Sequence, residues 1–581
     1  MKQSIQVNAY GNYSMTFILF FFFLILVACS KQTQTKNSDN KMPMTSGVVI
    51  GGSASTVTRP VTEQARPNLA HVFRTSIAAD INPDPDIVEI NLEAKESMVE
   101  FSDGVISKVY AYNGVVPGPL IKAKKGDTLI VNFTNNLPES TTIHWHGLQL
   151  PADMDGASVA QNPIETGGTF QYKFVLPDAS LFWYHPHVRS NVQVEKGLAG
   201  PLLVSDKEED ISLKLLPEHV LVLDDVLLDD LGEVKGPFAG TVEEVLLEKI
   251  NGREGNILLV NGEQQPTIKA RIGIPLRWRI VNIANSRFMK LSLDKHKFTR
   301  IGGDGGLLTR AIPNLNNIMV VPGERADIVV TPKGEPGEIL QLLWNDEPRG
   351  KHTVLIENGA VVMDHDHSDG MRPPIPLLNI ELIENSIEPK VLALPETLNV
   401  VEPIDITDAT VTTLAFGHTM PMPNGDIFFT INGKRFDEIT SDDAPDANVG
   451  ETQVWELVNM SMGDHPFHLH GFFFQVLDTV KKDENGNVVL EIPAPPLENK
   501  DMVNLPGRPG PIGSSTTLRI AVKFDPGHRN PEDILANGGV PAIVNADAAA
   551  GIKGHSGGWQ FHCHILEHAD GGMMSFMEIW Q

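Results

Sequence analysis

Cysteine is almost absent from this chain of 581 residues. Cys29 and Cys563 are the only two, so a framework of structural disulfides is excluded unless these two pair with each other. Pairing is not expected, because each lies in a segment with a different predicted role. Disulfides therefore have no predicted part in the fold.

Positive charge is also in short supply. The chain has 46 Lys and Arg residues against 73 Asp and Glu residues, a formal net charge of −27. This balance argues against nucleic acid and against an anionic membrane surface as partners. An acidic surface concentrates cations, which suits metal-ion substrates, although solubility alone explains the charge equally well.

Long helical periods are scarce, whereas 50 glycines and 41 prolines are present. This composition favours an all-β architecture, and the length suits three or four domains. A weak repeat supports three, because each copy has an Asn-Gly turn, a linking loop and an alternating strand, as a β-sandwich provides. The copies begin at Asn113-Gly114, Asn261-Gly262 and Asn432-Gly433.

The first cysteine follows an apolar run at residues 15–28. The run is too short for a comfortable membrane span, and Leu26-Val27-Ala28-Cys29 resembles a bacterial lipoprotein box. Residues 1–29 are therefore predicted to be a lipoprotein signal peptide and lipobox, cleaved before a lipid-modified Cys29, with a retained N-terminal anchor as the alternative. The polar residues 30–75 are predicted to be a flexible stalk. Either way, the body would be exported and tethered to the periplasmic or cell-surface face of a bacterial membrane.

The second cysteine lies in the richest segment of the chain, His562-Cys563-His564, which His568 and Met573 follow. If this segment is extended, Cys563 points to one face while His562 and His564 point to the other. The three side chains then cannot reach one metal ion, but they can serve two sites joined by a tripeptide, which suits electron transfer. One Cys, two His and a distant Met form the blue-copper ligand set.

Three more histidine clusters lie upstream of this segment. They are His144-Trp145-His146, His185-Pro186-His187 and His465-Pro466-Phe467-His468-Leu469-His470. A lone His-x-His is more often a solvated or hydrogen-bonded pair than a metal site. His564 to His568 also matches the H-x-x-E-H zinc-protease pattern, and Cys563 beside histidines could be a nucleophile. None of these alternatives explains all four clusters together.

With these four motifs, the chain from about residue 90 to its C-terminus resembles the three-domain multicopper oxidases, which include laccases, cuprous oxidases and bilirubin oxidases. The resemblance implies four copper ions. It makes His465, Cys563 and His568 ligands of a type 1 copper, with Met573 axial. Of the remaining ligands, it assigns His144 and His468 to a type 2 copper, His146, His185 and His564 to one type 3 copper, and His187, His470 and His562 to the other.

The resemblance also implies the fold and the mechanism. Three cupredoxin-like Greek-key β-sandwich domains are expected at residues 76–210, 211–365 and 366–581. The trinuclear cluster would lie between the first and the third, with the second as a spacer. Electrons would pass one at a time from the type 1 copper through Cys563 to His562 and His564, and four of them would reduce dioxygen to two waters.

Proton supply is the point at which the chain departs from the family pattern. Asp155 matches the carboxylate near the type 2 copper, although Asp155-Gly156 is also typical of a turn. Many bacterial relatives carry a glutamate directly after the last type 1 histidine, and this chain has Ala569 there. Two interpretations stay open: Asp570 or ordered water substitutes for it, or proton delivery is slower.

The electron donor is less well defined. Metal ions are favoured, chiefly Cu(I), with Fe(II) and Mn(II) as further candidates; the alternative is a laccase-like oxidase of phenols. A non-enzymatic copper-binding envelope protein is a third hypothesis. A substrate-metal site is predicted either at Met460, Met462 and Asp464 or in the Asp- and His-rich segment 363–371. The stretch 524–558 is predicted to be an inserted loop, and the protein is expected to be a monomer.

Overall fold

The computed structural model describes residues 76–580, apart from 103, 358–359, 365–370, 386–392, 420–426, 449 and 525–557. The predicted signal peptide, Cys29 and the stalk lie outside these residues, as do most of segment 363–371 and of loop 524–558. Among the residues described, no helix is long and apolar enough to cross a membrane.

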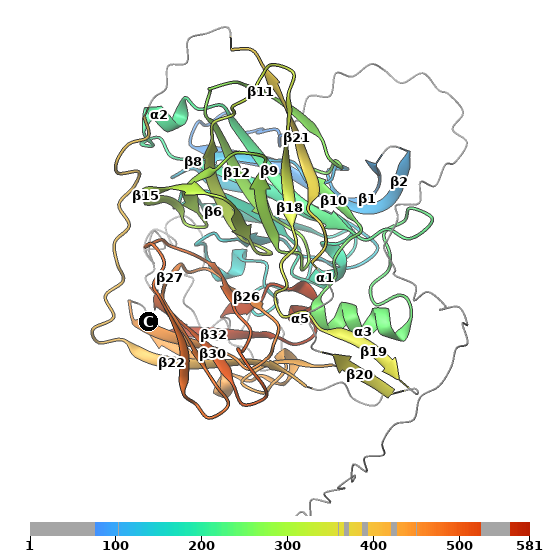
Figure 1. Cartoon of the computed structure of the whole chain (residues 1–581), viewed down its shortest axis with the longest axis vertical. Coiled ribbons are helices and arrows are strands. Elements are labelled where there is room, and N and C mark those ends of the chain that lie inside the picture. Colours follow the sequence, from blue (N-terminus) through green and yellow to red (C-terminus); the bar gives the residue numbers. More distant parts are fainter. Residues whose placement is uncertain are drawn as a thin grey trace, which may run out of the picture. The chain divides into compact units, whose positions relative to one another are not determined.

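Nearly all of the regular secondary structure in the described chain is β-strand (Figure 1), as its composition predicts. The first region contains β1 (Ile87–Ser102), β2 (Val105–Tyr112), β3 (Ile121–Lys124), β4 (Thr128–Asn136), β5 (His144–His146), β6 (Thr169–Val175), β7 (Leu181–His185), α1 (Ser190–Gln193) and β8 (Gly200–Ser205). The middle region contains α2 (Ile211–Lys214), β9 (Glu218–Val226), α3 (Val242–Asn251), β10 (Ile257–Val260), β11 (Thr267–Arg271), β12 (Leu276–Asn282), β13 (Met289–Leu293), β14 (Phe298–Gly303), β15 (Gly306–Leu315), β16 (Ile318–Val320), β17 (Arg325–Val330), β18 (Ile339–Asn345), β19 (Thr353–Glu357), β20 (Ala360–Asp364) and β21 (Ile375–Ile383). The last region contains β22 (Thr410–His418), β23 (Phe429–Ile431), β24 (Asp446–Asn448), β25 (Thr452–Asn459), β26 (His465–Leu469), β27 (Phe474–Lys482), β28 (Val488–Pro493), β29 (Met502–Leu505), β30 (Ser515–Lys523), β31 (Trp559–Cys563), α5 (Leu566–Asp570) and β32 (Met574–Trp580).

Each region has two large sheets with a hydrophobic core between them, and the middle region also has the two-stranded sheet β19-β20. The sheets are β2-β1-β4-β6 and β3-β8-β7-β5 in the first region, β10-β9-β12-β17-β14-β15 and β11-β21-β18-β13-β16 in the middle, and β23-β22-β25-β30-β27-β28 and β24-β32-β31-β26-β29 in the last. Each of the three large core clusters draws side chains from both sheets of one region. This confirms the predicted all-β sandwich architecture.

The domain limits themselves stay a prediction. β21 lies after the predicted boundary at residue 365, yet it pairs with β18 and β11 of the middle region. The sheets of the middle region therefore extend to Ile383.

The three Asn-Gly repeats form the same turn. Asn113, Asn261 and Asn432 have positive φ angles of 51°, 53° and 55°, a conformation that asparagine and glycine tolerate best. Each asparagine side chain also accepts a hydrogen bond from the backbone N–H of the neighbouring strand. The strands that follow, β4, β12 and β25, then run parallel to β1, β9 and β22. Local turn chemistry therefore repeats one strand arrangement three times.

Candidate metal centre

Four short strands carry the cysteine and histidine motifs. β5 pairs with β7 so that His144 lies opposite His185. β26 pairs with β31 so that His468 lies opposite His562 and Phe467 opposite Cys563. Cys563 and His562 therefore point to opposite faces of β31, as alternation in a strand requires.

One face of β31 carries the predicted type 1 group. The Sγ atom of Cys563 lies 3.4 Å from Nδ1 of His465 and 3.6 Å from Nδ1 of His568, and these two nitrogens are 3.3 Å apart. Atoms bound at about 2 Å to one ion lie roughly 3 to 4 Å apart, so the three can share an ion. Met573 is fully buried beside them, and its carbonyl oxygen accepts a hydrogen bond from the Cys563 N–H, 3.1 Å away.

Both type 1 histidines are oriented through their other ring nitrogen. Nε2 of His568 lies 3.0 Å from the carbonyl oxygen of Ile250, and Nε2 of His465 lies 2.7 Å from Oγ of Ser461. A carbonyl only accepts, so Nε2 of His568 carries the proton and Nδ1 is left to face Cys563. Ile250 belongs to α3, which contacts α5 (Figure 1). The middle region thus fixes a predicted ligand in the last region, and sequence analysis missed both Ser461 and Ile250.

Eight histidines from the first and last regions gather at the other face of β31. This eight-histidine group consists of His144, His146, His185, His187, His468, His470, His562 and His564. Nε2 of His562 lies 3.1 Å from Nε2 of His470 and 3.4 Å from Nε2 of His187. Nε2 atoms of His144 and His468 are 3.4 Å apart. The rings of His146, His185 and His564 lie with their centroids 4.9 to 5.7 Å apart. The structure therefore brings together every histidine that the resemblance assigned to the trinuclear cluster.

These rings share one orientation rule. In His144, His185, His468 and His562, Nδ1 lies 2.9 to 3.0 Å from a backbone carbonyl oxygen, that of Asp155, Pro186, Asp501 and Cys563 respectively. The proton must sit on Nδ1, which leaves the Nε2 lone pair for a metal ion. Backbone oxygen atoms therefore set the tautomer in four of the eight rings.

Burial keeps these rings ready to bind a metal. Burial is the largest cause of a lowered ring pKa in nine of these histidines. It lowers the pKa to about 3 in His465 and to about 4 in His562. It lowers the pKa well below the ordinary value in His146, His185, His187, His468, His470, His564 and His568. Neutral imidazole is the form that ligates metal. Burial also raises the pKa of the Cys563 thiol, so an arriving metal ion must displace its proton.

Several buried ring nitrogens make no hydrogen bond to the described part of the chain. Nδ1 of His146, Nε2 of His185 and both nitrogens of His564 have no hydrogen-bond partner among the described residues. A buried polar atom without a partner is costly unless a ligand satisfies it. Together with a Cys-His-His-Met set on the opposite face, these nitrogens fit copper.

The structure excludes the two catalytic alternatives for this motif. His564 lies outside α5, and His568 faces Cys563 and His465 rather than the group around His564, so the pair cannot hold one zinc ion. Cys563 is fully buried with a raised pKa, which makes an attacking thiolate unavailable. His568 lies in this short helix.

Asp155 lies within the eight-histidine group. Its Oδ2 is 2.7 Å from Nδ1 of His470 and its Oδ1 is 3.3 Å from Nδ1 of His144. It also follows a short 3-10 turn at Ala152–Met154, which confirms the turn interpretation, whereas the proton role of Asp155 stays a prediction. Gly156 is required after it, because a Cβ there would lie 2.0 Å from the Ile143 carbonyl oxygen.

A second acid, Asp501, was not predicted. Its Oδ1 lies 3.2 Å from Nε2 of His146, and its carbonyl accepts from His468. Arg325 of β17 forms a bidentate ion pair with it, with Nη1 2.6 Å from Oδ1 and Nη2 bonded to Oδ2. Burial raises the pKa of Asp501 to about 6, and Arg325 opposes that rise.

The middle region is therefore more than the spacer that was predicted. A Cβ on Gly323, just before Arg325, would lie 3.0 Å from atoms of both His146 and His564. A Cβ atom on Gly147 would lie 2.4 Å from the Arg325 guanidinium. The turn before β17 closes one side of the eight-histidine group, a contact that no local pattern reveals.

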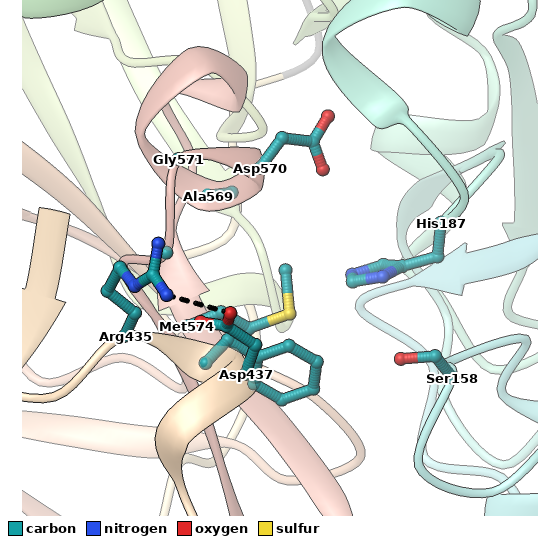
Figure 2. A pocket seen from close by; sticks show the side chains of 10 residues that line it. Ser158, His187, Arg435, Asp437, Ala569, Asp570, Gly571 and Met574 are labelled. Atoms are coloured by element: carbon teal, nitrogen blue, oxygen red, sulfur yellow. Dashed lines mark hydrogen bonds and ion pairs between the residues drawn. The ribbon is translucent and has the colours of Figure 1, made fainter. Parts of the chain in front are cut away.

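A cavity of about 370 Å³ adjoins this group (Figure 2). It is lined by Ser158, His187, Arg435, Phe436, Asp437, Ala569, Asp570, Gly571, Gly572 and Met574. Figure 2 shows the His187 ring and the Met574 side chain pointing toward each other across it. Burial raises the pKa of Asp570 to about 6, and its Oδ2 accepts a hydrogen bond from the Asn191 N–H. An acid thus lines this cavity next to Ala569.

The predicted substrate residues lie before His465 and differ in their surroundings. Met460 is 59% exposed, and Met462 is half-buried. Both carboxylate oxygens of Asp464 accept hydrogen bonds, from the Asn504 side chain and from the Gly507 N–H, each 2.8 Å long. Asp464 therefore holds a neighbouring loop, and a metal-docking role for the three residues stays a prediction.

Comparison with known proteins agrees with this geometry. Family models described as multicopper oxidase match residues 93–209, 233–339 and 404–579. The chain is 28% identical to "Multicopper oxidase mco" of Staphylococcus aureus, over 84% of this chain and 88% of that protein. It is 28% identical to a laccase of Bacillus subtilis, over 81% of this chain and 90% of that protein.

Solved structures give the same result. A multicopper oxidase of Campylobacter jejuni, described as a metallo-oxidase, matches with a TM-score of 0.68 and 27% identity, over 87% of this chain and 94% of that one. A laccase of Pediococcus acidilactici matches with a TM-score of 0.65 and 26% identity, over 87% and 93%. The chain belongs to the multicopper oxidase family and is a copper-dependent oxidoreductase that uses oxygen.

Proposed function

We propose that this protein holds four copper ions and couples four one-electron oxidations of a donor to the reduction of dioxygen to two waters. The observation that carries the proposal is the pair of metal-ligand groups on opposite faces of β31, joined at Cys563 and its two neighbouring histidines. Cys563, His465 and His568 would hold the type 1 ion with Met573, and the eight-histidine group would hold the other three. Bound copper supplies an ion that alternates between two oxidation states and so exchanges single electrons.

The residues of the chain supply the surroundings for this chemistry. Backbone carbonyls fix the tautomers of five of the ligand rings, and burial of both groups excludes bulk water. Asp155 is placed to hold a proton at Oδ2, against Nδ1 of His470. The cavity lined by Asp570 and His187 gives protons and water a route between solvent and the eight-histidine group.

The amide Asp155→Asn tests the proton role. It keeps an oxygen near His470 but cannot take up a proton, so we expect oxygen uptake to fall about 10²-fold for every donor, within the range of general acid–base catalysis. Copper content should stay unchanged. A variant that loses copper in proportion to its activity would make Asp155 a purely structural residue.

Metal ions are the proposed donor, chiefly Cu(I), with Fe(II) and Mn(II) next. The exposed Met460, the net charge of −27 and the metallo-oxidase described for the Campylobacter jejuni neighbour support this choice. The second candidate is a phenol or related organic donor, because laccases are also among the similar proteins. Both use the same copper chemistry.

Oxygen uptake by the copper-loaded protein, with Cu(I), Fe(II), Mn(II) and a phenol compared side by side, decides between them. We expect the highest kcat/KM with Cu(I), and a rise of about fivefold in its KM when Met460 and Met462 are changed to leucine, since each thioether is a weak ligand. Fast phenol turnover without preference for a metal ion would instead favour the laccase function.

We also propose that the protein is exported and tethered through a lipid on Cys29, on the strength of the sequence alone. Retention of the Cys29→Ser protein in the membrane fraction would argue against the lipid anchor.

A further inference from the structure

Two histidines that the copper ligand set does not use lie beside the type 1 group. His352 follows β18 in the middle region and His418 ends β22 in the last region. Their ring centroids are 5.9 Å apart and the rings are perpendicular. The two type 1 histidines, His465 and His568, have centroids 5.2 Å apart. An imidazole from a loop of the middle region and one from a strand of the last region thus lie at nearly the ring spacing of a ligand pair.

The end of α3 ties His352 to the type 1 group. The side chain of Asn251 accepts from the His352 N–H and donates to the His352 carbonyl, each at 2.8 Å. The preceding residue, Ile250, accepts from Nε2 of His568 at 3.0 Å. One helix end therefore positions both a predicted type 1 ligand and the buried His352.

A single aromatic ring separates His418 from the same ligand. Phe429 stacks on His568 with a centroid distance of 4.0 Å and lies 5.8 Å from His418. Nδ1 of His418 lies 3.0 Å from the carbonyl oxygen of Thr419, so Nδ1 carries the proton and Nε2 carries the lone pair. His418 is half-buried whereas His352 is buried, so the pair leads from the surface toward the type 1 group.

We propose that His352 and His418 form a docking site for a soft monovalent cation and that Cu(I) binds there as the electron donor. Two imidazole ligands suit Cu(I), whereas Cu(II) prefers a tetragonal site with more ligands. Such a site holds the reduced ion and releases the oxidised one. The balance is four Cu(I), one dioxygen and four protons giving four Cu(II) and two waters.

The surroundings favour this occupant. The Met460 N–H donates to the carbonyl of Phe416, two residues before His418 on the same strand, and its exposed side chain adds a soft thioether near the approach. The cations just before His352 are offset, because Arg349 and Lys351 both form ion pairs with Glu254. The inference rests on the proposed function, in which a metal ion is the electron donor. The experiment tests the docking site and the identity of the donor separately.

The test uses Ag(I), which resembles Cu(I) but is not oxidised, with the copper-loaded full-length protein. We expect the native protein to bind one Ag(I), and His418→Ala and His352→Ala to bind it at least about tenfold more weakly, as expected for the loss of a metal ligand. His418→Met should keep binding because it supplies another soft ligand. His296→Gln, in the turn after β13, is the matched control and should bind Ag(I) normally.

Kinetics provide the second measurement. In His418→Ala we expect the KM for Cu(I) to rise at least about tenfold, while the KM for a phenol and the visible absorption of the type 1 site stay unchanged. Unchanged Ag(I) affinity in both alanine variants would overturn the docking site even if Cu(I) remains the donor. An equal loss for all donors with an altered absorption band would also overturn it, since the pair would then only position His568.

If the native protein oxidises phenols alone, the proposed donor fails. Loss of Ag(I) binding in the alanine variants would still support the site as a soft-cation site.

Discussion

Cys563→Ser is expected to remove the intense visible absorption of the type 1 site and to lower oxygen uptake with every donor by at least about 10³-fold, equal to about 4 kcal/mol in activation free energy. The thiolate is the soft ligand that distinguishes this site, and a serine oxygen does not replace it. Cys563 also joins the two groups, because its neighbours His562 and His564 belong to the eight-histidine group. Of the four proposed copper ions, three should remain bound, since those histidines are untouched.

Copper content, visible absorption and oxygen uptake of the purified protein measure this result. Cys29→Ser changes the only other cysteine of the chain and should leave all three unchanged. If Cys563→Ser kept a tenth or so of the native rate, electrons would have to enter the eight-histidine group without the type 1 site. The proposed role of the His562-Cys563-His564 segment would then be wrong.

Arg325→Met is expected to destabilise the protein by about 3 to 5 kcal/mol, because it leaves Asp501 buried without its partner. The pKa of Asp501, already raised to about 6 by burial, would rise further, so the acid would become protonated near neutral pH. A protonated Asp501 is a weaker acceptor for Nε2 of His146, 3.2 Å away. We therefore expect copper to be lost from the eight-histidine group while the type 1 absorption persists.

Arg277→Met is the matched control for this prediction. Arg277 and Arg325 are both 1% exposed, and Arg277 forms a comparable bidentate pair with Asp327 of β17. Both variants should unfold at a lower temperature, but only Arg325→Met should lose copper. Equal copper loss in the two would mean that Arg325 acts through general stability alone, and full copper retention in Arg325→Met would show that Asp501 does not depend on it.

The ligand set could be predicted because it depends on local geometry. Alternation along a strand separates Cys563 from His562 whatever surrounds them, and the structure places them on opposite faces. The three Asn-Gly turns are equally local, since a positive φ is tolerated best by these residues.

Other features needed the assembled chain. β12 was expected to alternate, yet all seven of its residues are buried, because Arg277 and Arg279 form ion pairs with Asp327 and with glutamates before and within β9. A charged side chain can be buried when its ion-pair partners lie elsewhere in the sequence, so the hydrophobic periodicity of one strand does not predict it.

The sequence by itself determined which metal-binding residues are present, that they fall into two groups, and that the architecture is all-β. Only the tertiary structure decided which nitrogen of each ring faces the metal site, since that depends on acceptors such as Ile250 and Asp501 far along the chain. It also decided that the middle region closes the eight-histidine group through Gly323 and Arg325. The physical reason is that ligand identity is a property of single residues, whereas ligand orientation is set by hydrogen bonds that form only when separate segments pack together.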